Sequence, residues 1–189
     1  MLGLDYRIAF SGVRTRLPSS LPRKEHTVPE VIHHPAGKGP TVWFGDAVYT
    51  FKATTATTGG SLTFAEATVP PGGGPPPHVH PSTDEAFFIL GGELEFLNGE
   101  ETFLAGEGDF VWVPRGTRHR FRNVGLHNAR MIFLFSPGAG MEGFFTTIGT
   151  EAKAGVAPPP LTPEQMKQIV ELAPQFGIML SPPPPGQAA

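Results

Sequence analysis

The chain has 189 residues and a formal net charge of -3, and it contains no cysteine. This length suffices for one well-cored domain, and the lack of cysteine excludes disulfide bonds and thiolate metal sites. The chain is slightly acidic and its arginines are scattered, so the sequence does not predict the basic patch that nucleic-acid binding requires. No apolar run approaches the roughly 20 residues that span a bilayer, and residues 1–20 lack the apolar core of a signal peptide. We therefore expect a cytoplasmic protein that makes no membrane contact.

Proline and glycine divide the first part of the chain into an irregular region and a β-rich region. Residues 1–40 contain five prolines and are predicted to form an irregular N-terminal arm. Strands are predicted within residues 41–52 and 61–69. Residues 70–77, with the sequence PPGGGPPP, are too stiff and too poor in donors for a central strand. We expect them to form a rim loop that leads to His78.

Two histidines and a glutamate follow this loop. In a strand, residues i and i+2 point the same way, so His78 and His80 can both face a barrel interior. Glu85 lies five residues beyond His80, an odd offset that would place it on the opposite face of an unbroken strand. The turn-forming residues 81–84 interrupt the strand, so a new strand over residues 85–90 can begin with Glu85 facing inward.

Two turn signals organise the next part of the chain. Asn98-Gly99 lies between alternating apolar residues, which is the strongest short-range signal for a β-hairpin. Residues 114–117, with the sequence PRGT, predict the tight turn of a second hairpin. This hairpin would join the apolar strand 110–113 to a strand that carries His119 near its start.

The C-terminal part is predicted to add a helix to the barrel. Residues 131–135 form the last predicted strand, and residues 141–148 can form a short helix or a turn that closes one end. A helix is predicted over residues 163–172, with Thr162 as N-cap and Gln165 completing a capping box, and its apolar stripe is expected to pack on the barrel's outside. The predicted organisation is an arm at 1–40, a barrel at 41–150, an extension with this helix at 151–180 and a proline-rich disordered tail at 181–189.

Ten positions in two segments match both signature motifs of the cupin superfamily, which the chain resembles. These positions are Gly72, His78, His80, Glu85 and Gly92, then Gly108, Pro114, Gly116, His119 and Asn123. The resemblance implies an all-β fold, a double-stranded β-helix or jelly-roll barrel. It also implies that His78, His80, Glu85 and His119 bind one divalent metal ion. Such a donor set suits Fe(II), Mn(II), Co(II), Ni(II), Cu(II) or Zn(II), and the sequence does not select among them.

Within the superfamily, the chain is similar to bacterial single-cupin proteins that resemble quercetin 2,3-dioxygenase. The similarity is carried by residues 78–92, HVHPSTDEAFFILGG, and by residues 143–149, GFFTTIG. It implies a dioxygenase in which the 3-hydroxyl of a flavonol binds the metal and Glu85 takes its proton as the catalytic base. O2 then opens the heterocycle with loss of carbon monoxide.

Five phenylalanines can line a cavity around the metal or can fill the barrel core. They are Phe64, Phe87, Phe96, Phe121 and Phe133. An aromatic cavity beside an open metal would suit a flat, hydroxylated aromatic substrate.

Two other classes of function fit the same motifs. One is a non-oxidative metal-dependent isomerase, cyclase or lyase, whose activity would persist without oxygen. The other is a non-catalytic cupin that binds a small ligand. Because single-cupin proteins commonly dimerise, we also expect a homodimer, and the outward-facing Phe88 and the apolar strands within residues 41–51 would suit its interface.

Overall fold

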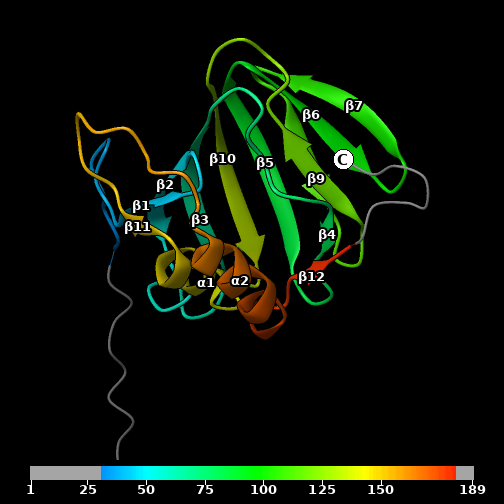
Figure 1. The fold of residues 1–189 in the computed structure, drawn as a ribbon. Coiled ribbons are helices and arrows are strands. Elements are labelled where there is room, and N and C mark those ends of the chain that lie inside the picture. The colour runs from blue at the N-terminus through cyan, green and yellow to red at the C-terminus, as the bar shows by residue number, and fades with distance from the viewer. Residues whose placement is uncertain (1–30, 182–189) are drawn as a thin grey trace, which may run out of the picture. The chain divides into compact units, whose positions relative to one another are not determined.

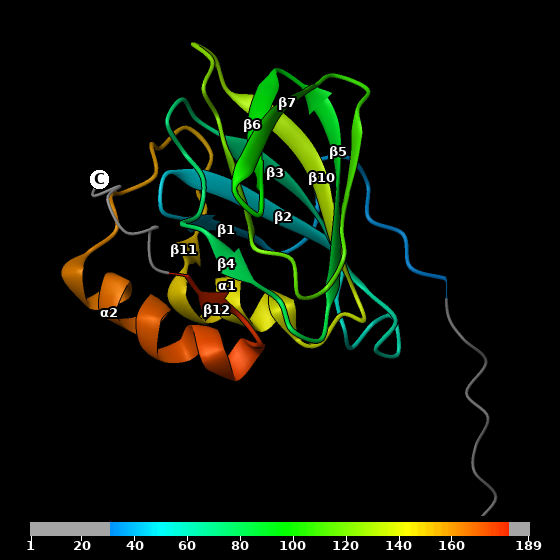
Figure 2. The same ribbon diagram turned by 90° about the vertical axis from the view of Figure 1, so that its right-hand side faces the viewer.

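The computed structural model describes residues 31–181, and its strands and helices belong to one compact unit that begins at Ile32 (Figures 1 and 2). The structure of residues 1–30 of the predicted arm, and of residues 182–189 of the predicted tail, lies outside the described residues. The strands are β1 (Thr41–Phe44), β2 (Ala47–Ala53), β3 (Thr63–Val69), β4 (His78–Val79), β5 (Asp84–Gly91), β6 (Glu93–Asn98), β7 (Glu101–Gly106), β8 (Phe110–Val113), β9 (His119–Arg122), β10 (Ala129–Ser136), β11 (Thr150–Glu151) and β12 (Met179–Leu180). The helices are α1 (Met141–Ile148), α2 (Pro163–Leu172) and the 3-10 turn η1 (Ala173–Phe176).

The strands form two antiparallel sheets that enclose the core. The seven-stranded sheet has the order β11-β1-β2-β3-β10-β5-β8, and the five-stranded sheet has the order β12-β4-β9-β6-β7. Most neighbours in these sheets are distant in sequence, as in a double-stranded β-helix. The predicted all-β jelly-roll fold with a short C-terminal helix is therefore confirmed.

Alternation along the strands determines which side chains fill the interior. In β3 every second residue from Thr63 to Val69 is buried, and β10 follows the same pattern. The rings of Phe51, Phe87 and Phe135 are no more than 2% exposed. Burial of each such ring stabilises the fold by roughly 1.5–3 kcal/mol.

The first predicted hairpin forms, whereas the second does not. Strands β6 and β7 pair through Asn98↔Glu101, and Gly99 at the turn has φ 65°. The chain does turn between β8 and β9, but these strands belong to different sheets. Strand β8 pairs with β5, while β9 pairs with β4 and β6. The hairpin prediction at residues 110–122 was therefore wrong, because a local turn signal does not specify which sheet the next strand joins.

The C-terminal elements close one end of the barrel. Both views place α1 and α2 together at that end (Figures 1 and 2). The predicted capping box of α2 is present, since the Gln165 backbone N–H donates to Thr162 Oγ1 over 3.2 Å and the Thr162 backbone N–H donates to Gln165 Oε1 over 3.0 Å. Strand β12 pairs with β4 in the register Leu180↔His78, so the C-terminal segment lies directly beside one of the motif histidines.

Candidate metal centre

Four motif side chains from both sheets converge inside the barrel. His78 lies on β4 opposite His119 at the start of β9, and Glu85 lies near the start of β5 in the other sheet. His80 follows directly after β4. All four side chains are buried, and one candidate ligand atom from each lies within 4.8 Å of the others. They form a cluster that can hold a metal ion.

Two of the histidines are oriented by the backbone of their own segments. His78 Nδ1 lies 2.9 Å from the Pro76 carbonyl oxygen, and His119 Nδ1 lies 3.0 Å from the Thr117 carbonyl oxygen. Because a carbonyl oxygen can only accept, each Nδ1 must carry the proton and donate it. This leaves Nε2 of each ring as the ligand atom, which is how outer hydrogen bonds usually set the tautomer of a metal-binding histidine.

The carboxylate of Glu85 lies close to the rings of His119 and His80. Its Oε2 lies 2.8 Å from His119 Nε2 and 3.3 Å from His80 Nε2. Since Nδ1 of His119 is already a donor, the short contact to Glu85 requires a second proton on Nε2. With a metal ion bound by the cluster, that proton would not be needed, because the ring and the carboxylate would both serve as ligands.

His80 provides the clearest sign that these residues fit a metal. Neither of its ring nitrogens has a hydrogen-bond partner within residues 31–181, although the side chain is only 3% exposed. Leaving a buried polar atom unsatisfied costs about 1–3 kcal/mol. A metal ion bound by the cluster would give one of these nitrogens a partner, and the set of three imidazoles and one carboxylate suits a divalent transition metal.

Burial and mutual charge shift the ionisation of the cluster. Burial alone would raise the pKa of Glu85, but the hydrogen bond to His119 and the charges of His80 and His119 hold it at about 2. Burial, with the charge of His119 adding to it, lowers the pKa of His78 to about 4. For His119, burial opposes protonation, yet the contact with Glu85 raises its pKa above the ordinary value. At neutral pH the cluster therefore presents an ionised carboxylate and a neutral His78, both ready to bind a cation.

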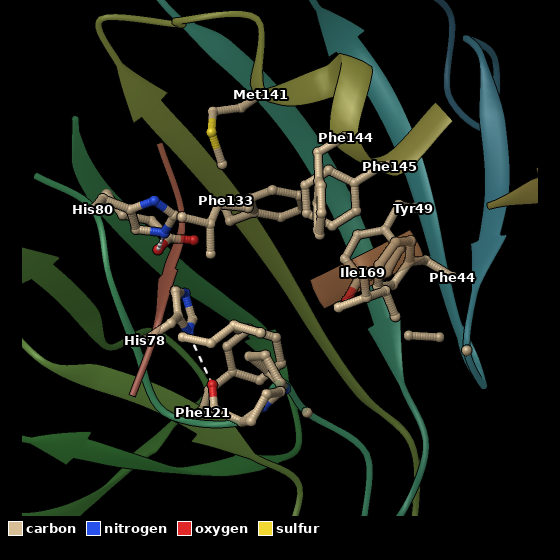
Figure 3. A pocket seen from close by; sticks show the side chains of 18 of the residues that line it. Phe44, Tyr49, His78, His80, Phe121, Phe133, Met141, Phe144, Phe145 and Ile169 are labelled. Carbon is tan, nitrogen blue, oxygen red and sulfur yellow. Dashed lines mark hydrogen bonds and ion pairs between the residues drawn. The ribbon is translucent and has the colours of Figure 1, made fainter. Parts of the chain in front are cut away.

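A cavity of about 390 Å³ opens from this cluster. His78, His80 and Glu85 line one end of it, and Figure 3 shows Phe44, Tyr49, Phe144 and Phe145 gathered away from the two histidines. Phe133 lies between the two groups (Figure 3). The lining is mostly apolar, and its volume falls in the range of about 300–1,000 Å³ that is typical of small-molecule sites.

Two of the five predicted cavity phenylalanines line this space. Phe121 and Phe133 do so, whereas Phe64, Phe87 and Phe96 do not. Phe64 is half-buried on the face of β3 opposite the inward Thr63 and Ala65, because side chains alternate along a strand. Phe87 and Phe96 pack against each other in the core, with ring centroids 5.1 Å apart.

Most of the apolar lining was not predicted from the sequence. Phe44 and Tyr49 come from β1 and β2, while Met141, Phe144 and Phe145 come from α1. The stripe of α2 that was expected to pack on the barrel's outside also lines the cavity, through Met166, Ile169 and Val170. For the residues on α2, the sequence signal was the apolar stripe of the predicted helix, and for Phe144 and Phe145 it was the GFFTTIG segment.

Within residues 31–181, no helix combines the length and the apolar character that crossing a membrane requires.

Residues 65–135 match the cupin domain family. The chain is 28% identical to Quercetin 2,3-dioxygenase of Bacillus subtilis (strain 168), over 69% of this chain and 38% of that protein. It is 42% identical to Polyketide synthase CurC of Streptomyces cyaneus, over 32% of this chain and 39% of that protein. The chain thus spans about two fifths of the length of these two relatives.

Among solved structures, the chain is similar to an uncharacterized conserved protein with a double-stranded beta-helix domain from Klebsiella pneumoniae subsp. pneumoniae MGH 78578. The TM-score is 0.46 at 20% sequence identity, and the match covers 52% of this chain and 83% of that chain.

Proposed function

We propose that this chain, which contains a cupin domain at residues 65–135, is a metal-dependent dioxygenase acting on a hydroxylated aromatic substrate of the flavonol type. The observation that carries the proposal is the buried cluster of His78, His80, Glu85 and His119 at one end of a mostly apolar cavity. The similarity to a quercetin 2,3-dioxygenase over 69% of the chain supports the same assignment.

The four clustered side chains would hold the metal, and Glu85 would also act as the catalytic base. A divalent metal bound there would polarise a substrate hydroxyl group and promote the reaction of the substrate ring with O2. Glu85 lines the cavity, and its carboxylate is ionised at neutral pH, as a proton acceptor must be. Its Oε2 faces His80 and His119, which leaves Oε1 to accept the hydroxyl proton. The apolar walls would exclude water from the reacting centre.

The net reaction proposed for a flavonol consumes one O2 and releases one carbon monoxide. Both oxygen atoms enter the organic product, at the two carbons that flank the hydroxyl-bearing carbon, and that carbon leaves as carbon monoxide. The hydroxyl proton taken by Glu85 returns to the product carboxylate or to solvent.

Oxygen uptake by reconstituted protein tests this proposal. Metal-stripped protein is loaded singly with Fe(II), Mn(II), Co(II), Ni(II), Cu(II) or Zn(II) and mixed with quercetin or other hydroxylated aromatics. We expect uptake with at least one redox-capable metal, accompanied by carbon monoxide release and lost in His80→Ala. Stoichiometric metal binding without uptake for any metal would contradict the dioxygenase assignment.

A non-oxidative reaction is the second candidate, favoured by the 42% identity over 60 residues to a protein named for polyketide synthesis. In this case the metal would serve only as a Lewis acid on a polyketide-like substrate. Activity on such a substrate that is unchanged under strict anaerobiosis would support it, whereas an absolute requirement for O2 would exclude it.

The outer face of the seven-stranded sheet offers a surface for the expected homodimer. Phe88 on β5 lies opposite Phe110 on the neighbouring strand β8. Their side chains are 41% and 62% exposed, respectively. Trp112 on the same edge strand is 49% exposed. The apolar strands within residues 41–51 are less available for dimer formation, because β11 covers the edge of β1. We propose that two chains dimerise through the edge strand β8. Sedimentation measures the dissociation constant of the dimer, which should rise in Trp112→Ser. An unchanged dissociation constant in this variant would contradict the proposed interface.

A further inference from the structure

The end of the cavity remote from the metal cluster is an aromatic chamber built by parts of the chain outside residues 65–135. We call this region the distal chamber and define it by Phe44, Tyr49, Phe144, Phe145 and Ile169 (Figure 3). Its members come from β1, β2, α1 and α2. The segment that matches the cupin family therefore supplies the metal cluster, but not these walls.

Tyr49 brings a hydroxyl into this otherwise apolar chamber. Its ring is held by three neighbours, with centroid distances of 4.9 Å to Phe145, 5.6 Å to Phe133 and 6.4 Å to Phe44. The residue is only 7% exposed, and it lines the cavity. No group in residues 31–181 forms a hydrogen bond with its hydroxyl. A buried tyrosine usually finds such a partner, so this hydroxyl is a donor available to a ligand.

The surroundings of Tyr49 keep that hydroxyl protonated. Burial raises its pKa above the ordinary value, and the negative charges of Asp46 and Glu85 raise it further. Asp46 also lines the cavity but is exposed, so water can solvate its carboxylate. Tyr49 is therefore the buried donor of the chamber, at the opposite end of the cavity from His80 (Figure 3).

We propose that the distal chamber is a specificity subsite for an aryl group bearing a hydrogen-bond acceptor, and that the Tyr49 hydroxyl donates to this acceptor while the other end of the substrate lies at the metal cluster. This inference rests on the proposed function and extends it. Aromatic rings on several sides would receive a flat ring by stacking or edge contacts. The single hydroxyl would select among rings of similar shape, because leaving it unpaired in a dry site is unfavourable.

Two probes and two matched variants test the subsite. Tyr49→Phe keeps the ring and removes only the hydroxyl. Thr50→Val removes a hydroxyl from the opposite face of the same strand, where Thr50 contacts Thr41. Quercetin carries hydroxyl groups on its outer rings, whereas unsubstituted 3-hydroxyflavone has the same metal-binding oxygens without them. Binding of each to Zn(II)-loaded protein is measured anaerobically by titration calorimetry, so that turnover does not interfere.

We expect Tyr49→Phe to weaken quercetin binding by about fivefold to tenfold, the range for loss of one hydrogen bond, and to leave 3-hydroxyflavone binding within about twofold. Thr50→Val should change neither. Equal losses for both probes in Tyr49→Phe, or no loss for either, would overturn the subsite.

Oxygen uptake is measured separately, so that the two proposals can fail independently. If Tyr49→Phe selectively loses quercetin binding but the wild-type protein takes up no oxygen, the dioxygenase proposal is overturned and the subsite proposal stands. Uptake without selective loss would overturn the subsite alone. Failure of the wild-type protein to bind either probe would overturn both.

Discussion

The two ends of the cavity differ in composition and in origin. The metal end consists of three imidazoles and a carboxylate. They come from β4, the residue that follows it, β5 and β9, and all lie within the segment that matches the cupin family. The distal chamber consists of aromatic and aliphatic side chains from strands and helices on both sides of that segment. If the proposed function holds, the metal chemistry would reside in one compact motif, and substrate selection would depend on the flanking parts of the chain. Variants at the two ends should therefore affect different kinetic parameters.

The largest effect is expected at the metal end, from Glu85→Gln. The amide can still offer an oxygen to the metal but cannot take a proton, so we expect kcat to fall by about 10²–10⁴-fold while most of the metal is retained. Stopped-flow oxygen consumption and metal analysis of the same sample would measure both. Retained activity in this variant would remove Glu85 as the base.

At the distal end, Phe145→Ala should separate binding from chemistry. The Phe145 ring lies 4.9 Å from Tyr49 and 5.3 Å from Phe44, centroid to centroid. Its loss should lower the free energy of unfolding by about 3 kcal/mol and raise KM about tenfold without loss of metal. Denaturant unfolding, steady-state kinetics and metal analysis check these three effects.

Phe103→Ala provides the matched control for that variant. Phe103 is 42% exposed on β7 and stacks on Phe96, away from the cavity lining. We expect a smaller loss of stability and an unchanged KM. A loss of metal in Phe145→Ala, or equal KM effects in both variants, would contradict the division between the two ends.

A smaller effect is expected where α1 is anchored. The Glu142 carboxylate accepts hydrogen bonds from the Thr55 backbone N–H at 3.0 Å, from Thr55 Oγ1 at 2.9 Å and from Thr63 Oγ1 at 2.6 Å. Glu142→Gln should lower the free energy of unfolding by about 1–3 kcal/mol, because these bonds lose their charged acceptor. Glu164→Gln, at an exposed position in the first turn of α2, should change stability by a few tenths of a kcal/mol at most. Equal stability of the Glu142 and Glu164 variants would show that this anchor contributes nothing.

The smallest effect concerns pH and the turn that precedes β9. Arg115 donates to the Asp84 carboxylate through its side chain and its backbone N–H, and these bonds hold the pKa of Asp84 at about 2. Because the pKa is lower in the folded state, the stabilisation is present above about pH 4 and is lost as pH falls toward 2. The difference in Tm between wild type and Asp84→Asn should therefore shrink between pH 5 and pH 2.5. A constant difference across this range would contradict the role of the ion pair.

Local patterns predicted much of the fold. The Asn98-Gly99 turn and the capping box of α2 depend on residues close together in sequence, and both form as predicted. The pairing of β8 with β5 could not be predicted in this way, because it depends on how the whole barrel closes. The turn at residues 114–117 has the same local geometry whether the following strand returns to the same sheet or crosses to the other.

The two ends of the cavity also differ in how far a short stretch of sequence predicts them. The spacing of His78, His80 and Glu85 lies within eight residues, so strand alternation and one turn suffice to predict a shared interior. Phe44 and Phe145, in contrast, lie on β1 and α1, and they meet only because the chain crosses the barrel between them. Their residue types look like ordinary core, so no short pattern marks them as walls of a cavity.

Metal stoichiometry shows whether the buried cluster of three histidines and Glu85 is a metal site. Wild-type protein and the His80→Ala, His119→Ala and His127→Ala variants are loaded with Co(II), dialysed, and compared by metal analysis and by visible absorption of the bound ion. His127 is exposed and lies outside the cluster, so it serves as the control. We expect one ion per chain in wild type and in His127→Ala, and loss of that ion in the other two variants. Retention of a full equivalent in His80→Ala and His119→Ala would contradict it.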